Sequence, residues 1–183
     1  LIIDMQSKEM RRGGERINFY GNSLFKGEDI TATKPSERVK KGIVLCRERH
    51  PVFPESDVLE NLKIAGYLKK RKEVKASIEY VFDMFPALSK LKTRKAGFMS
   101  GGEQQMLAIG MALVVRPKLL LLDEPLLGLS PMMQQVVMEA VVNLKEHSGI
   151  TVLISEQFAR PVLPVIDRGY VVENGMLALD GTG

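Results

Sequence analysis

Two stretches, MSGGEQQ at residues 99–105 and LLLLDEP at residues 119–125, decide the fold of this chain of 183 residues. In the first stretch Ser100 suits a helix N-cap, and Glu103 stands three residues later, a spacing that predicts a capping box. The pair Gly101-Gly102 allows the backbone to come close to a ligand. The first turn of such a helix presents free N–H groups and the positive end of the helix dipole, so the stretch predicts an anion-binding helix start.

The second stretch predicts a strand that delivers two carboxylates. Leu119 to Leu122 are apolar on both faces, as in a buried parallel strand. Asp123 and Glu124 follow at its C-terminal end, where open α/β sheets place their ligands. Taken alone, the capping box can be purely structural, and an apolar strand that ends in an acid is common in α/β proteins. One predicted helix joins the two stretches, and this combination is specific.

Together the two stretches resemble the signature loop and the Walker B strand of ATP-binding-cassette (ABC) ATPases. The resemblance covers roughly residues 23–183 and implies an α/β fold: a P-loop-NTPase-like, mostly parallel sheet core with an inserted helical subdomain, N-terminally incomplete in this chain. It implies ATP and Mg²⁺ as cofactors, with Asp123 holding the Mg²⁺ shell and Glu124 polarising the attacking water. The helix start would close over ATP across a dimer through Ser100, Gly101, Gly102 and Glu103.

Two further residues follow predicted strands. Glu48 comes after the strand candidate at residues 42–46, and in position it resembles the Q-loop residue that lies near the metal and the attacking water. Most ABC ATPases carry Gln there, whereas the ATPases of branched-chain amino-acid importers typically read PEGRRVFP, an ending that residues 52–54 keep. From the residues alone, without the downstream motifs, an exposed charged turn is the better interpretation of Glu48 and its neighbours.

Gln157 comes after residues 150–154, which predict another buried strand. Most ABC ATPases place a switch histidine at this position, where it touches the γ-phosphate. The branched-chain amino-acid branch often reads VEQN, so the resemblance implies that Gln157 senses the γ-phosphate together with Glu48. Without the resemblance, Gln157 reads as a residue at a helix N-terminus that points to water.

We expect three segments along the chain. Residues 1–50 form a partial ATPase core with antiparallel strands and the Q-loop. Residues 51–98 form the helical subdomain, with a capping box that begins at Asp57 and an amphipathic helix over 73–85. Residues 99–183 hold the signature helix, Walker B, D-loop, switch region and C-terminal hairpin of the ATPase core.

The last segment carries further local signals. Ser130 stands in the segment that resembles the D-loop, which crosses the dimer interface in the family, and it also reads as an N-cap with Pro131 in the first helical turn. The helix that follows runs to about His147, and Gly149 closes it. Asn174-Gly175 predicts a hairpin with a type I′ turn.

Composition limits the partners. The net charge of +4 is spread along the chain, so we expect no nucleic-acid partner. No apolar run approaches the ~20 residues that span a bilayer. Cys46 is the one cysteine, which excludes an internal disulfide and fits a reducing compartment. The resemblance implies a cytoplasmic location, peripheral on the inner face of the membrane. Its partners would be a second ATP-binding subunit and permease subunits, one of whose short helices enters the groove of the helical subdomain.

The sequence contains no Gly-x-x-x-x-Gly-Lys-[Ser/Thr] P-loop, which such an ATPase needs to hold phosphates. Family spacing puts it at or before the first residues, so we expect a chain that lacks both ends or a degenerate gene product. The first hypothesis is an ATP-binding and hydrolysing subunit of an ABC importer, for branched-chain amino acids, that drives transport by ATP-dependent dimerisation. The alternative is a catalytically incompetent protein that supplies only the signature half-site and the permease-docking surface. An ABC-type DNA-repair ATPase carries long coiled coils, and no heptad pattern is sustained here.

Overall fold

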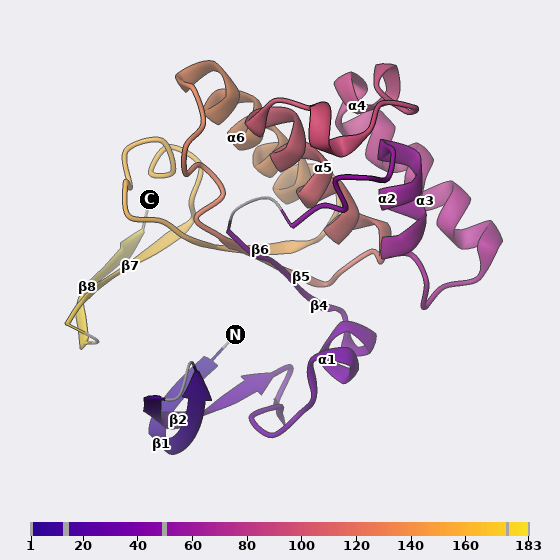
Figure 1. Ribbon diagram of the computed structural model, residues 1–183. Coiled ribbons are helices and arrows are strands. Elements are labelled where there is room, and N and C mark those ends of the chain that lie inside the picture. Colours follow the sequence, from indigo (N-terminus) through magenta and orange to yellow (C-terminus); the bar gives the residue numbers. More distant parts are fainter. Residues whose placement is uncertain (1, 13–14, 49–50, 175, 183) are drawn as a thin grey trace. The chain divides into compact units, whose positions relative to one another are not determined.

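The computed structural model describes residues 2–12, 15–48, 51–174 and 176–182, and the chain divides into two compact units, residues 1–41 and 42–183 (Figure 1). The first unit is an antiparallel sheet in the order β1-β2-β3 followed by a short helix. Its elements are β1 (Ile2–Arg12), β2 (Glu15–Phe25), β3 (Glu28–Asp29) and α1 (Pro35–Lys41). Lys26 and Gly27 join β2 to β3 with φ of 52° and 81°, as a type I′ turn requires.

The second unit is built on a parallel sheet in the order β4-β5-β6. Its strands are β4 (Ile43–Cys46), β5 (Leu119–Asp123) and β6 (Thr151–Ser155). Cys46 pairs with Leu122, and Leu122 pairs with Ile154, so the three strands run in register to one edge. This sheet confirms the predicted parallel core.

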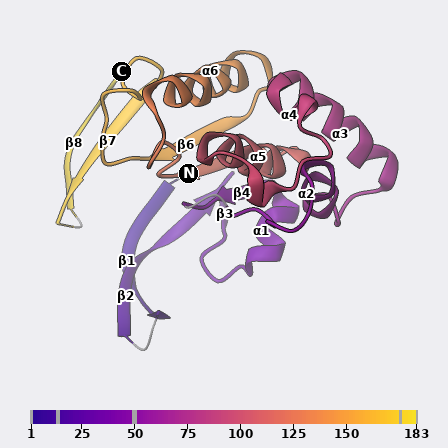
Figure 2. The same ribbon diagram turned by 45° about the horizontal axis from the view of Figure 1, so that its top comes forward.

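Helices occupy most of the rest of the second unit. They are α2 (Val58–Ala65), α3 (Arg71–Met84), α4 (Pro86–Lys90), the 3₁₀ helix η1 (Ala96–Phe98), α5 (Gly101–Val114) and α6 (Pro131–His147), and a hairpin of β7 (Arg168–Glu173) and β8 (Met176–Thr182) follows. Figures 1 and 2 both show α2, α3 and α4 gathered on one side of α5. Gly110 permits this close packing, because an added Cβ would lie 2.8 Å from Val81.

The local predictions for these helices are confirmed. Asp57 caps α2 in a complete capping box, and Ser130 caps α6 with Pro131 in the first turn. The helix predicted over residues 73–85 spans Arg71–Met84. Gly149 has a φ of 66° just after α6, as expected for the residue that ends a helix. Among the residues that the structure describes, no helix is both long and apolar enough to cross a bilayer.

The two faces of the sheet of the second unit are buried to different degrees. On one face Leu120 and Leu122 are fully buried, and α5 contacts β4 while α6 contacts β6. On the other face Leu45, Leu121 and Leu153 lie side by side across the three strands. Leu45 is 53% exposed and Leu153 is 42% exposed.

The prediction that residues 150–154 form a buried strand is wrong in one respect. The strand is present as β6, but its residues alternate between exposed and half-buried. It is the last strand of the three-stranded sheet, so only one of its faces is covered and one of its edges has no neighbouring strand within the described residues. The predicted β7–β8 hairpin is confirmed. Its turn includes Gly175, which lies outside the described residues.

Candidate functional site

The carboxyl ends of β4, β5 and β6 bring together the acidic and amide residues that the sequence singled out. Asp123 is the last residue of β5 and pairs with Ser155, the last residue of β6. Glu48 follows the end of β4 by two residues. Because parallel strands in register end at one edge of a sheet, Glu48, Asp123, Glu124 and Gln157 share that edge, the usual place for a ligand in an open α/β sheet.

Glu124 is held in place by β6 and by the residues that follow it. Its backbone N–H donates to the carbonyl of Ser155 at 2.9 Å, and its carboxylate oxygen Oε1 accepts a hydrogen bond of 2.7 Å from Nε2 of Gln157. Its φ is 44°, in the left-handed region that few residues other than glycine adopt. Such strain persists only where the surroundings fix the conformation, and it clusters at functional sites.

Glu156 belongs to the same edge, although no pattern in the sequence predicted a role for it. Its Oε1 accepts a hydrogen bond of 2.8 Å from the backbone N–H of Leu126. Partial burial raises the pKa of Glu156, and the carboxylates of Glu124 and Asp123 raise it further, whereas backbone hydrogen bonds from Leu126 and Gln157 act in the opposite direction. The only signal in the sequence was its place next to Gln157, in the position of the Glu in VEQN.

The predicted helix start forms as a second, separate feature. Ser100 caps α5, and Glu103 completes the capping box: the Ser100 N–H donates to Oε2 of Glu103 at 2.7 Å. Gly101 is exposed and Gly102 is buried. A Cβ at Gly102 would lie 2.6 Å from Cγ of Met133 on α6, so this glycine is required by helix packing in addition to any approach to a ligand.

The oxygen donors at the sheet edge have the chemistry that Mg²⁺ accepts. This ion binds oxygen ligands and usually takes one or two carboxylates together with substrate phosphates and water. Asp123, at the end of β5, and Glu48, two residues after β4, supply carboxylates from adjacent strands. Among the described residues, no group of three or more His, Cys, Asp or Glu side chains is placed to hold a metal by itself.

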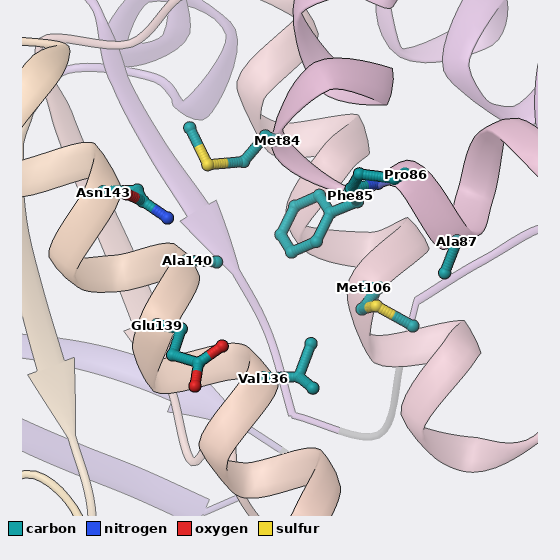
Figure 3. Close-up of a pocket in the computed structure, with 9 residues that line it drawn as sticks. All are labelled: Met84, Phe85, Pro86, Ala87, Met106, Val136, Glu139, Ala140 and Asn143. Carbon is teal, nitrogen blue, oxygen red and sulfur yellow. The ribbon is translucent and has the colours of Figure 1, made fainter.

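A small hollow of about 180 Å³ lies elsewhere in the second unit, between the α3–α4 junction, α5 and α6 (Figure 3). Most of the side chains that line it are apolar, and the two polar ones, Glu139 and Asn143, both come from α6. The lining residues are Met84, Phe85, Pro86, Ala87, Met106, Val136, Glu139, Ala140 and Asn143. None of the residues predicted for the site lines this hollow, so it is distinct from the carboxylate edge.

A family model and similar known proteins point to the same family. The family model described as ABC transporter matches residues 7–127. The high-affinity branched-chain amino acid transport ATP-binding protein BraG of Pseudomonas aeruginosa is 40% identical over 163 residues, which cover 89% of this chain and 70% of that protein. A probable branched-chain amino acid transport ATP-binding protein, LivF of Archaeoglobus fulgidus, is 38% identical over 162 residues. The match covers 88% of this chain and 69% of that protein.

A solved structure agrees with these relatives. The crystal structure of the ADP conformation of MJ1267, an ATP-binding cassette of an ABC transporter, matches with a TM-score of 0.79 and 33% identity. The match covers 91% of this chain and 70% of that one. The fold and the sequence of this chain are therefore similar to the same group of proteins.

Proposed function

This chain belongs to the ABC transporter family, and from that premise we propose that it is the ATP-binding and hydrolysing subunit, or most of one, of an importer for branched-chain amino acids. The names of BraG and LivF support the choice of solute. In this proposal ATP-dependent dimerisation with a second ATP-binding subunit drives transport.

The observation that carries the proposal is the hydrogen bond between Gln157 and Glu124 beside Asp123 at the edge of the parallel sheet. Glu124 polarises the attacking water and accepts its proton, a role that contributes on the order of 10²–10⁴-fold to such reactions. Gln157 orients the Glu124 carboxylate and contacts the γ-phosphate. Glu48 senses the same phosphate from the end of β4.

Asp123 would hold the shell of a Mg²⁺ ion, with Glu48 close to it. The bound ion would supply charge neutralisation on the phosphates. Phosphoryl transfer depends mainly on positioning and electrostatics, and a P-loop that holds the phosphates is absent from the 183 residues. Ser100, Gly101, Gly102 and Glu103 act across the dimer, on the nucleotide of the other subunit.

The helical segment of residues 51–98 is the proposed contact with the permease. Large apolar side chains are exposed on it, namely Phe53, Ile64, Tyr67, Leu68 and Phe98. Exposed apolar side chains mark an interaction surface where they form a contiguous patch, which is what a docked permease helix would cover. Docking there would hold the subunit against the cytoplasmic face of the membrane, where amino acids leave the permease.

The test uses a form of the protein that carries a P-loop ahead of this sequence. We expect this form to hydrolyse MgATP and Glu124→Gln to accumulate as an ATP-bound dimer, measured by phosphate release and by size-exclusion chromatography. Equal turnover in the Gln variant would remove Glu124 from the role of base.

A second candidate function is supported by the complete capping box at Ser100. In this candidate the chain supplies only the signature half-site and the permease-docking surface to a partner that holds its own phosphates. Titration of the 183-residue chain with MgATP separates the two candidates, because sub-millimolar affinity contradicts the second one.

A further inference from the structure

We propose that Glu156 is a positioning residue that connects the segment after β6 to the segment after β5. Through this contact it fixes the position of the start of α6 relative to the Glu124 carboxylate. The proposal rests on the proposed ATPase function for its catalytic consequence. Its structural part concerns a single contact, the hydrogen bond from the Leu126 N–H to Oε1 of Glu156 at 2.8 Å.

Two neighbouring residues after β6, Glu156 and Gln157, form hydrogen bonds with two different residues after β5. Gln157 donates to the side chain of Glu124, and Glu156 accepts from the backbone of Leu126. Leu126 is only 4% exposed, and a buried backbone N–H without a partner is costly. Leu126 lies in neither a helix nor a strand, so no regular hydrogen bond pairs its N–H. The carboxylate of Glu156, 30 positions later in the sequence, accepts from it instead.

The contact lies at the start of a tight turn that leads into α6. The Leu127 N–H donates to the carbonyl of Glu124 at 3.2 Å, and the Leu129 N–H donates to the carbonyl of Leu126 at 3.2 Å. Gly128 lies within this turn and has a φ of 72°, and Ser130 then caps α6. Fixing Leu126 therefore fixes where this turn and the helix after it begin.

From the start of α6 the connection continues to the signature helix. Met133, in the first turn of α6, fills the space beside Gly102 so closely that a Cβ there would meet its side chain. Glu156 thus connects the residues that face one nucleotide, Glu124 and Gln157, with the helix start that faces the nucleotide of the other subunit. This series of contacts therefore links the parts of one subunit that face the two different nucleotides of the proposed dimer.

The first test needs no nucleotide and uses the 183-residue chain as it is. Amide hydrogen exchange at Leu126, read by NMR or by fragmentation mass spectrometry, should become about tenfold faster or more in Glu156→Ala, because the N–H loses its partner. Glu156→Gln keeps an acceptor oxygen and should exchange close to the original rate. Glu139→Ala, which removes an exposed carboxylate from α6, is the matched control.

Unchanged exchange at Leu126 in Glu156→Ala would overturn the proposal. Should the Ala variant fail to fold, Glu156→Asp takes its place, because its side chain is one methylene shorter and does not reach Leu126 in the same geometry. Faster exchange of the Leu126 amide than in the original chain is expected there as well, and an unchanged rate would contradict the proposal equally.

The second test uses the P-loop-containing ATPase. Glu156→Ala should lower kcat about tenfold at an unchanged KM for ATP, since the residue acts on Glu124 and α6 and not on the nucleotide. Glu156→Gln should restore most of the rate. If the original protein turns over ATP and the Ala variant does so equally, the positioning role is overturned while the proposed function stands. If the exchange result holds and the original protein has no ATPase activity, the proposed function fails while the contact stands.

Discussion

The side-chain amide of Gln157 donates a hydrogen bond of 2.7 Å to the carboxylate of Glu124, a residue 33 positions earlier in the chain. The contact joins the ends of two adjacent parallel strands, because Asp123 pairs with Ser155 at the sheet edge. It defines the orientation of Glu124, one of the two carboxylates at the end of β5.

Replacing Gln157 should slow ATP hydrolysis by the P-loop-containing form. In Gln157→Ala the Glu124 carboxylate loses its donor, and we expect kcat to fall about tenfold, the size expected for one hydrogen bond to a charged group. Gln157→His keeps a donor and should retain most of the rate. Steady-state phosphate release measures both variants, and a fully active Ala variant would show that this hydrogen bond does not orient Glu124 for catalysis.

Gly102→Ala should destabilise the chain through overpacking. The added Cβ would lie 2.6 Å from Cγ of Met133 and 3.1 Å from its Cβ, atoms near the backbone that cannot move aside freely. We expect a loss of about 1–3 kcal/mol in the free energy of unfolding, measured by urea denaturation. The double variant Gly102→Ala/Met133→Ala is the control and should be less destabilised than the sum of the two single changes. Strict additivity would contradict the contact.

Glu156 should give the protein a pH-dependent stability. Its pKa is raised above the ordinary value of 4.5 in the folded state, so the folded protein binds the proton more tightly than the unfolded chain. This contribution to stability is present below pH 4.5 and is lost as the pH rises through the raised folded-state value.

Urea denaturation at a series of pH values, compared between the original protein and Glu156→Gln, measures this effect. The Gln variant keeps an acceptor for Leu126 but has no carboxyl to titrate, so its stability relative to the original should increase as the pH rises above 4.5. A difference that stays constant with pH would show that the carboxyl of Glu156 titrates normally in the folded state.

Cys46 should be inert in the folded protein. It is 3% exposed at the end of β4, and burial raises the pKa of its thiol to about 12. Because the thiolate is the reactive form, alkylation by iodoacetamide near neutral pH should be very slow. The same chain in urea should react at the rate of an ordinary exposed thiol. Rapid labelling without denaturant would mean that β4 opens readily.

The sequence by itself determined the features that depend on local spacing. Ser100 with Glu103, and Asp57 with Glu60, form the predicted capping boxes, because the geometry of a helix start involves only residues three positions apart. The apolar run of Leu119 to Leu122 forms the predicted parallel strand. The shared edge of Glu48, Asp123, Glu124 and Gln157 was also predictable, because parallel strands place their carboxyl ends together.

Only the tertiary structure decided which residues far apart in the sequence contact one another. The hydrogen bond from the Leu126 N–H to Glu156 and the packing of Gly102 against Met133 are two examples. Both depend on how the strands are paired and how closely the helices approach, which no local sequence pattern predicts. The burial of β6 was mispredicted for the same reason. An apolar strand has the same sequence pattern whether it lies in the middle of a sheet or at its edge. How far it is buried depends on the elements that pack beside it in the fold.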